Sequence, residues 1–512
     1  MQSTYKTFLL ALIAAICLLP ACRKDESSMD SNKIPGVVID TTGQGTLSVY
    51  QFTNLVVTPN LTTTGLSEAD LSYEWKINSR PMVNEFEVIS TERDLNEEIR
   101  LRPITGSIGY KLVLTVTDKK NDLNYIMSWP VIVRNNIGEG LLVASTLDNQ
   151  HTDISHIMSP EVTTDYTGVS VKHQVYSSIN GDLIDGLVKQ MRYIKFFGVD
   201  GYFAITDNSI IRINSLDQTF SAKDATLFFA PYSPIHPQSM SGVYQSDIFI
   251  INNRFTYTNL GASRAIGAPY DNEFTVPAQV AVNPNNSNFT YTPVTSINFY
   301  DEVRGHFVYL QTILPFGGDT KMYAHPSTAG AFNAGNLPNK QNLAAGYTVD
   351  RGFLHVLKDK TSGKTEAYLF KEGTDDVPAP VPDVVIDLSS APGIGEATKF
   401  VIMDDQKVLY YATPTKIYAM MYSTSTPVFE ERYTIPAGEQ LTTLQVYQDP
   451  TYPVSWDPFI ATNNRQLIMS TYGTEGKVYI LPIRNLGAGN IDVPNIKTFT
   501  GFGRITAIGT QK

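Results

Sequence analysis

The fold class is indicated most clearly by residues 297–310, INFYDEVRGHFVYL. An apolar run ends in the turn residues Asp301 and Glu302, a basic residue follows, and a second apolar run begins at Phe307. Apolar β-branched and aromatic residues are typical of strands, whereas Asp, Asn and Gly are typical of turns. The stretch therefore predicts a β-hairpin.

The same pattern recurs along the C-terminal part of the chain, in residues 347–357 (YTVDRGFLHVL), 401–411 (VIMDDQKVLYY) and 459–469 (FIATNNRQLIM). The turns are 49, 54 and 59 residues apart, measured between Asp301, Asp350, Asp404 and Asn463. If the four hairpins are equivalent, one structural position just before the turn is shared by Tyr300, Val349, Met403 and Thr462.

A further strand is expected after each of the last three hairpins, at residues 365–371, 416–422 and 477–482. Several antiparallel strands repeated at this spacing are typical of propeller blades. Residues 137–512 would hold about seven blades of roughly 54 residues, with six or eight left open. Residues 505–508 would complete a blade begun near Leu141. A solenoid or a pair of sandwiches is the alternative fold.

Residues 34–136 show a different pattern, with short strands expected at 47–50, 71–77, 110–117 and 126–133. Apolar and polar residues alternate from Tyr110 to Thr117, the period of two of a half-buried strand. About a hundred residues of this kind predict a β-sandwich. We expect Trp75 to lie in the core between two sheets, although an exposed tryptophan would be a platform for stacking sugars.

Two stretches of this first domain, YEWKI (73–77) and YKLVLTVTD (110–118), resemble the signature strands of PKD-like, immunoglobulin-type domains. The resemblance covers about a fifth of the chain. We expect this domain to be a spacer that lifts the rest of the chain off the membrane.

The N-terminus has a basic residue, Lys6, an apolar run from Phe8 to Leu19, and the sequence Leu-Pro-Ala-Cys ending at Cys22. The run is shorter than the roughly 20 apolar residues that span a bilayer. The motif resembles a lipobox, which implies a signal peptide over 1–21 and a lipid on Cys22. An ordinary secretory signal is the alternative.

Residues 22–33 are charged and rich in Ser, which predicts a flexible tether. Within it, Lys24, Asp25 and Glu26 resemble the surface-export signal of Bacteroidetes lipoproteins. The resemblance implies a protein anchored by lipid in the outer membrane and facing the cell exterior.

Composition excludes some classes of function. The chain has a net charge of −11, and removing the leader with Lys6 leaves 38 basic against 50 acidic side chains, or −12. Proteins that bind nucleic acid usually carry basic patches, so nucleic acid is not an expected partner.

Both cysteines, Cys17 and Cys22, lie at the leader, so the processed chain has no disulfide. No long amphipathic helix is evident, so the predicted class is all-β.

The layout of lipobox, PKD-like domain and repeat region resembles the PKD-like family lipoproteins of Bacteroidetes. Genes of that family tend to lie beside SusC/SusD-type nutrient uptake systems. The resemblance therefore implies SusC/SusD-type proteins as partners.

Motifs for catalysis are missing from the sequence, which has no HExxH, GxSxG or P-loop. His151 and His156 would face opposite ways on a strand, so we expect no metal site there.

A glycosidase would need two carboxylates at a fixed separation. The acidic turn residues offer candidates, but their repetition favours turn geometry: Asp301, Glu302, Asp350, Asp404 and Asp405. We expect no catalytic residue and no cofactor.

Binding is the favoured function. The loop YQDPTYPVSWDP, residues 447–458, holds aromatic side chains between prolines. Rigid loop aromatics are good ligand platforms, so Trp456, Tyr452 and Tyr447 are the candidate binding residues. The alternative for Trp456 is a plug between blades.

Three functions stay open at this point. The first is a non-catalytic accessory of a nutrient uptake system that binds a glycan or a protein-derived ligand. The second is a scaffold that contacts only neighbouring surface proteins. The third is a propeller glycosidase or lyase. Converging carboxylates would favour the enzyme, an aromatic shelf the binding protein, and a broad apolar patch the scaffold.

Overall fold

A computed structural model describes the all-β chain over residues 36–40, 45–104, 108–196, 199–243, 246–257, 266–270, 273–283, 294–311, 321–328, 330–424, 426–453 and 458–512. Contacts divide the chain into two compact units, unit 1 (1–136) and unit 2 (137–512). Among the described residues, no helix is both long enough and apolar enough to cross a membrane.

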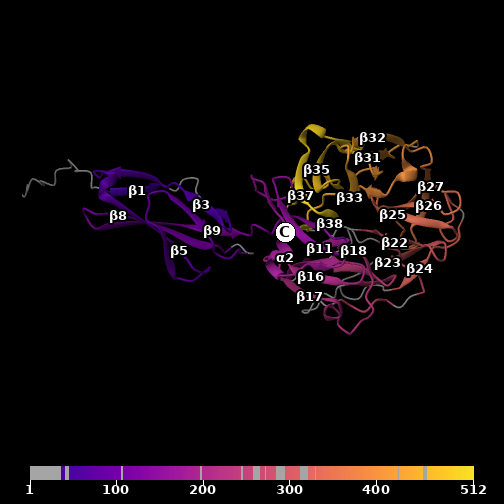
Figure 1. The fold of residues 1–512 in the computed structure, drawn as a ribbon, viewed down its shortest axis with the longest axis horizontal. Helices are drawn as coiled ribbons and strands as arrows, with labels where there is room; N and C mark the ends of the chain where they lie inside the picture. The colour runs from indigo at the N-terminus through magenta and orange to yellow at the C-terminus, as the bar shows by residue number, and fades with distance from the viewer. Residues whose placement is uncertain are drawn as a thin grey trace, which may run out of the picture. The chain divides into compact units, whose positions relative to one another are not determined.

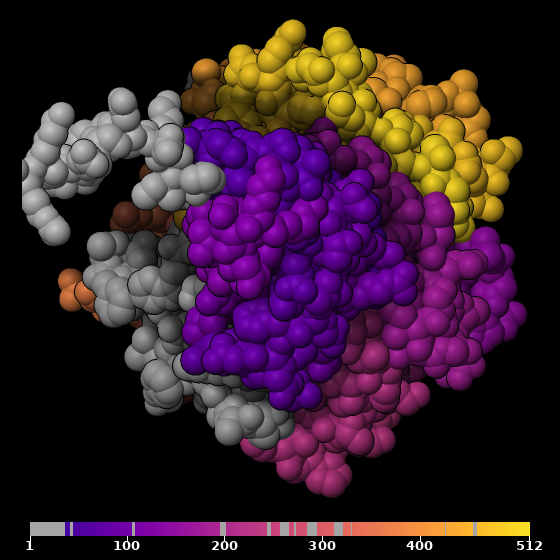
Figure 2. Space-filling model, turned by 90° about the vertical axis from the view of Figure 1, so that its left-hand side faces the viewer, coloured from indigo at the N-terminus to yellow at the C-terminus, as the bar shows by residue number. Residues whose placement is uncertain are grey.

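Unit 1 is built of one larger sheet and two strand pairs (Figure 1). Its described residues are the indigo to purple atoms in the space-filling view of Figure 2. The larger sheet has the order β2 (Leu47–Tyr50), β9 (Leu123–Arg134), β8 (Tyr110–Asp118), β5 (Leu71–Asn78) and β6 (Phe86–Ser90). The pairs are β1 (Gly36–Asp40) with β4 (Asn60–Thr64), and β3 (Thr53–Val57) with β7 (Leu95–Ile99). The sheet and the pairs contribute to one hydrophobic core, as expected of a sandwich.

Trp75 lies at the centre of this core with 0% of its surface exposed. Its ring stacks on Trp129 with centroids 5.9 Å apart, and its Nε1 donates a hydrogen bond to the carbonyl of Glu92 at 3.0 Å. Along β8, Tyr110, Leu112 and every second residue after them are buried. The predicted alternation and the predicted core position of Trp75 are both confirmed.

Unit 2 consists of antiparallel sheets that we number by their order. Sheet 1 contains β38 (Arg504–Gln511), β10 (Gly140–Thr146), β11 (His151–Met158) and β12 (Ser170–Lys172), with β13 (Ile184–Asp185) beside β11 and helix α2 (Val175–Asn180) following β12. Sheet 2 contains β14 (Gln190–Phe196), β15 (Val199–Ile205), β16 (Ile210–Asn214) and β17 (Phe220–Lys223). Sheet 3 contains β18 (Pro237–Val243), β19 (Ser246–Ile251) and β20 (Arg254–Tyr257).

The remaining sheets follow in chain order. Sheet 4 contains β21 (Ala281–Val282), β22 (Thr295–Asp301), β23 (His306–Gln311) and β24 (Met322–Ala324). Sheet 5 contains β25 (Lys340–Thr348), β26 (Gly352–Asp359), β27 (Thr365–Lys371) and β28 (Val381–Asp387). Sheet 6 contains β29 (Lys399–Ile402), β30 (Val408–Ala412), β31 (Lys416–Met421) and β32 (Val428–Thr434). Sheet 7 contains β33 (Gln440–Val446), β34 (Gln466–Tyr472), β35 (Gly476–Asn485) and β37 (Lys497–Phe502), with β36 (Asn490–Ile491) beside β35.

Apolar side chains fill the space between each sheet and the next. Separate core clusters lie between sheets 1 and 2, 2 and 3, 3 and 4, 4 and 5, 5 and 6, 6 and 7, and 7 and 1. The second strands of the sheets are covered on both faces, which explains why β22 and β30 are buried throughout and show no alternation. Outer strands such as β28 and β32 have no buried residue, and β32 lies toward the outside of the unit in Figure 1.

The first strands of the sheets contact one another in order: β38 with β14, β14 with β18, β18 with β21, β21 with β25, β25 with β29, β29 with β33, and β33 with β38. The predicted pairing of the C-terminal strand is confirmed, because β38 pairs with β10 along its length, with Ile508 opposite Val143. The last segment of the chain therefore completes the sheet that begins unit 2.

The predicted equivalence of the four hairpins was wrong for the first copy, and in the fourth copy residues 459–462 form no strand before the turn, because β33 already ends at Val446. The turns at Asp350, Asp404 and Asn463 join the first and second strands of their sheets, whereas the turn at Asp301 joins the second and third. Successive connections in an antiparallel sheet lie at opposite ends. Lys360, in the turn between the second and third strands of sheet 5, lies 3.1 Å from Glu302. Tyr300 therefore does not share the position of Val349 and Met403.

Two buried histidines lie where sheets 4 and 5 meet. His355 is 0% exposed, contacts the ring of Phe307 with centroids 5.0 Å apart, and has no hydrogen-bond partner among the described residues for either ring nitrogen. His325 places its Nε2 3.1 Å from Oδ1 of Asn298. Burial lowers the pKa of each histidine to about 3, so both are neutral at physiological pH.

We expect these histidines to make the protein less stable in acid. Between pH 6.5, the unfolded pKa, and about 3, the unfolded chain binds protons that the folded chain does not, so stability falls as the pH is lowered. His355→Leu removes one such group. We compare the unfolding free energy of His355→Leu with that of the wild type, measured with urea at pH 4 and at pH 7. The difference should shift in favour of the variant by roughly 2–3 kcal/mol at the lower pH. His236→Leu, at an exposed site, is the control, and a His355→Leu curve parallel to the wild type would contradict the assignment.

Candidate ligand-binding cavity

Several residues singled out from the sequence lie outside the described residues. These are the lipidation residue Cys22, the export residues Lys24, Asp25 and Glu26, and the loop residue Trp456.

Tyr447 is a core residue, so its selection as a ligand-binding aromatic was wrong. It is 1% exposed, lies in the cluster between sheets 7 and 1, and donates a hydrogen bond from its hydroxyl to the carbonyl of Val162 at 3.3 Å. The plug between sheets that the sequence analysis considered for Trp456 is the role that Tyr447 has.

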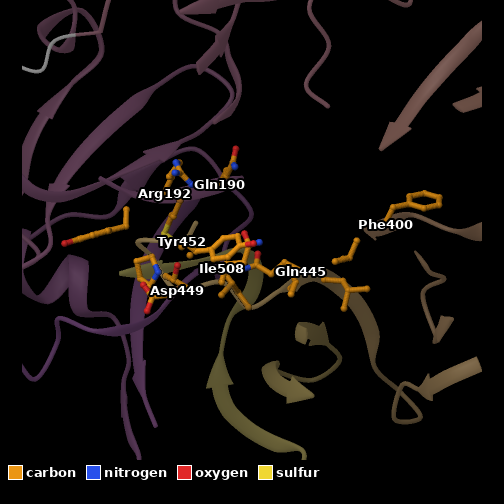
Figure 3. Close-up of a pocket in the computed structure, with 16 residues that line it drawn as sticks. Gln190, Arg192, Phe400, Gln445, Asp449, Tyr452 and Ile508 are labelled. Atoms are coloured by element: carbon orange, nitrogen blue, oxygen red, sulfur yellow. The ribbon is translucent and has the colours of Figure 1, made fainter. Parts of the chain in front are cut away.

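Tyr452 lines a cavity of about 320 Å³ in unit 2. The wall comes from the first strands of sheets 1, 2, 6 and 7, namely β38, β14, β29 and β33, and from the segment after β33. In Figure 3, Arg192 and Gln190 of β14 lie near Tyr452 and Asp449, while Phe400 of β29 lies on another side. The cavity therefore combines residues that are more than 250 positions apart in the sequence.

Two polar side chains of β14 are held by sheet 3. The Nε of Arg192 lies 2.7 Å from the carboxylate of Asp247. The amide of Gln190 donates to the carbonyl of Met240 at 2.7 Å and accepts from its N–H at 2.7 Å. Arg192 also packs on Gly242, where a Cβ would lie 1.6 Å from its Nη2. Any larger residue at position 242 would displace the guanidinium, so this glycine is needed for the cavity wall.

Asp247 shows how strongly this wall is desolvated. Burial raises the pKa of its carboxyl although the guanidinium of Arg192 acts in the opposite direction. The pair is worth little as a source of stability, because desolvation offsets the attraction. Its effect is to fix Arg192 in one position beside the cavity.

The hydroxyl of Tyr452 donates a hydrogen bond to Asp404, in the turn between β29 and β30. Asp404 also accepts from the amides of Gln448 at 3.2 Å and Asn464 at 3.1 Å. The next residue, Asp405, forms an ion pair of 2.7 Å with Arg465. These contacts tie the segment after β33 to sheet 6 and hold the ring of Tyr452 at the cavity.

Asp449 is the one acidic residue among the described residues that line the cavity, and Arg192 is the one basic residue. The Oδ1 of Asp449 accepts hydrogen bonds from the N–H and hydroxyl of Thr451 at 2.9 and 2.7 Å. Its Oδ2 is buried and lies 3.8 Å from the amine of Lys512. Asp449 is therefore used within the protein, and the lining offers no second carboxylate for acid–base chemistry across a glycosidic bond.

The other acidic turn residues do not converge. Asp301 accepts hydrogen bonds from the N–H groups of Val303 and Arg304, which is the turn geometry that the sequence predicts. It lies at the opposite end of the sheets from Asp350 and Asp404, as the hairpin connections require.

The histidines of β11 face opposite sides of their strand. His156 is buried, with its Nε2 3.3 Å from the carbonyl of Gly138, whereas His151 lies 2.6 Å from Asp148. Within the described part of the chain, no group of three or more His, Cys, Asp or Glu is placed to hold a metal ion.

The sequence analysis did not identify Arg192, Gln190 and Gln445 as parts of this site. Gln190 and Arg192 are two residues apart on β14, so their side chains point to the same face of the strand. Nothing in the local sequence distinguishes that face from the outer surface of any polar strand.

A model of the PKD-like family matches residues 25–187, about a third of the chain. The match covers unit 1 and continues through β10, β11, α2 and β13 of unit 2. The comparison with curated proteins finds no match.

Among solved structures, the β-propeller domain of Cps50 (Swd1) from Myceliophteria thermophila is 13% identical with a TM-score of 0.35, covering 63% of this chain and 90% of that one. The extracellular domain of the putative hybrid two component system BT4673 from B. thetaiotaomicron is 10% identical with a TM-score of 0.34, covering 83% and 57%. The WD40 domain of SCAP from fission yeast is 7% identical with a TM-score of 0.23, covering 71% and 72%. The PKD-like match is therefore the specific finding for the first part of the chain.

The carboxyl of Asp404 should give the cavity wall a pH dependence. Burial raises its pKa from 3.8 to about 6, so the folded state binds more protons than the unfolded state between these values. Its contribution to stability is present below about pH 4 and is lost as the pH rises through 6. As the pH rises from 4 to 7, the unfolding free energy of Asp404→Asn should therefore increase by about 1–3 kcal/mol relative to that of the wild type, measured by urea unfolding.

The control for Asp404→Asn is Asp375→Asn, which changes the same charge at an exposed site. If the difference in unfolding free energy between Asp404→Asn and the wild type did not change with pH, Asp404 would keep one protonation state from pH 4 to pH 7. That result would contradict the raised pKa.

Proposed function

We propose that the chain is an accessory lipoprotein of a SusC/SusD-type nutrient uptake system, acylated at Cys22 and displayed on the outside of the outer membrane. It binds a glycan or a protein-derived ligand and does not change it chemically. The lipobox at residues 19–22 and the charged residues after it support the anchoring and the display. The PKD-like match over residues 25–187 supports a protein of this layout.

We infer that unit 2 is a β-propeller of seven blades, with sheets 1 to 7 as the blades. The pairing of β38 with β10 supports closure of the ring. The successive contacts between first strands and the separate core between each pair of neighbouring sheets support it as well. On this inference the cavity beside Tyr452 lies at the centre of the ring, where the first strands meet.

The observation that carries the binding function is the makeup of this cavity. It joins the aromatic ring of Tyr452 with the side-chain amides of Gln445 and Gln448 and one guanidinium, Arg192. Concave sites that combine apolar contact with a few fixed polar groups are typical of small-ligand binding. Because Arg192 and Tyr452 are already held by Asp247 and Asp404, little ordering entropy is lost on binding.

The enzyme alternative is less well supported by the same cavity. Glycosidases need two carboxylates on either side of the cleaved bond, and the described lining provides Asp449 alone. The scaffold alternative is distinguished by experiment, since a scaffold would associate with neighbouring surface proteins and bind no soluble ligand.

Anchoring and display are tested with Cys22→Ser in intact cells. We expect the wild type to be labelled by a fatty-acid probe and digested by added protease, because it is acylated and faces outward. Cys22→Ser should lose the label. Replacing Lys24, Asp25 and Glu26 with Ala should keep the label and protect the protein from digestion. Equal labelling of Cys22→Ser, or equal digestion of the triple variant, would contradict the respective assignment.

Ligand binding is tested by calorimetry of the full processed chain against a panel of neutral oligosaccharides and a tryptic peptide digest. For any ligand found, Tyr452→Ala should weaken binding by about tenfold, or about 1.4 kcal/mol, through loss of the ring. Tyr452→Phe, which keeps the ring, should retain most of the affinity. Tyr472→Ala, at an exposed tyrosine away from the cavity, is the control. Unchanged affinity in Tyr452→Ala would place the ligand elsewhere.

A further inference from the structure

Unit 2 has a second, larger cavity of about 870 Å³ that shares no residue with the one beside Tyr452. Its lining comes from β10 and β11 of sheet 1, from the turn between them, from residues 173–185 and from residues 501–503 of sheet 7. Lys223 at the end of β17 completes it.

Three polar side chains on neighbouring strands form a buried part of the lining, where apolar residues fill the other positions between sheets 1 and 7. They are Ser145 of β10 and Asp153 and Ser155 of β11, which are 8%, 8% and 2% exposed. The Oδ1 of Asp153 accepts from the N–H groups of Ile154 and Ser177 at 2.8 and 3.1 Å, and Ser155 accepts from the N–H of Gln174 at 3.1 Å.

Ser145 is different, because its hydroxyl has no hydrogen-bond partner among the described residues although the residue is more than nine-tenths buried. Its oxygen is not one of the fully enclosed polar atoms that lack a partner among the described residues, so the hydroxyl is open to the cavity. Its position on the cavity lining leaves the hydroxyl oxygen available to a ligand.

The charged groups around this buried part are mainly negative. Asp148, Asp153, Asp182 and Asp185 line the cavity, against Lys223 as the one lysine or arginine in the described lining. Asp148 is paired with His151 at 2.6 Å and raises the pKa of that histidine. Asp182 and Asp185 are exposed, and Asp185 lies 3.9 Å from the Nε2 of His151. Clefts lined by one sign of charge attract ligands of the opposite sign.

A metal ion does not fit these groups, because no set of three acidic or histidine ligands converges in the described residues. An organic cation does not need three converging ligands. An ammonium group has three N–H donors and is satisfied by separate acceptors, such as a hydroxyl oxygen and carboxylates.

We propose that the cavity lined by Ser145, Asp182 and Asp185 is a second binding site, and that it takes a ligand carrying a primary ammonium group. An amino sugar and the lysine side chain of a peptide share this chemistry. The site is independent of the central cavity, so it stands whether or not Tyr452 contacts a ligand.

Calorimetry of the full processed chain at low ionic strength tests the site with three probes: triglucosamine, its N-acetylated counterpart and trilysine. We expect at least one of the two amines to bind, and the N-acetylated trisaccharide, which keeps the sugar but lacks the charge, to bind at least tenfold more weakly than triglucosamine or not at all. Tighter binding of triglucosamine assigns an amino sugar, and tighter binding of trilysine assigns a basic peptide. Equal affinity for the two trisaccharides, or no binding of either amine, would overturn the proposal.

Variants locate the amine in the cavity. Asp182→Asn with Asp185→Asn should weaken amine binding at least tenfold, and Ser145→Ala at least threefold, with melting temperatures that show the fold retained. Asp375→Asn with Asp376→Asn makes the same change of charge at two exposed residues outside the cavity, and should leave affinity unchanged. An equal loss in this control would show that the amine responds only to the net charge of the protein. Full affinity in Ser145→Ala would show that the hydroxyl does not contact the amine. Either result would overturn the site.

Discussion

The pairing of β38 with β10 is the interaction on which the arrangement of unit 2 depends. It joins the last strand of the chain to the first strand of the unit, pairing residues that lie 358 to 371 positions apart. The core between sheets 7 and 1 forms across this junction, and Gln511 is tied to Gln218 by a side-chain hydrogen bond of 3.1 Å. Without the pairing, the inner edge of β10 would expose unpaired backbone groups, the situation that favours aggregation.

The same arrangement determines which parts of the fold could be predicted. Strands such as β30 that are covered on both faces and largely apolar could be predicted from the sequence, as could the third strands after the last three hairpins. The order of strands within sheet 4 was not found. A hairpin of two fully buried strands has no alternating pattern, so nothing in residues 297–310 indicates whether it joins strands one and two or strands two and three.

The candidate site was predictable only where it depends on local sequence. Tyr452 was selected because prolines and aromatics cluster around it, and the structure places it at the cavity. The same argument failed for Tyr447, because proximity to that loop does not reveal that the ring turns into the core between sheets 7 and 1. Arg192 and Gln190 could not be found, since their position opposite Tyr452 follows from contact between β14 and β38, which is a long-range property of the fold.

The two cavities differ in how their polar groups are satisfied, and this difference bears on what each can bind. Beside Tyr452, Arg192 and Gln190 already have partners in sheet 3, so a ligand there gains from shape and from positions that are fixed in advance. Beside Ser145, the serine hydroxyl has no partner among the described residues, and the exposed Asp185 has a long contact of 3.9 Å with His151, so a ligand gains by completing hydrogen bonds and by charge. Polar residues replace apolar ones in this part of the seam between sheets 1 and 7. A bound cation would pair with them beside the junction that the β38–β10 pairing creates.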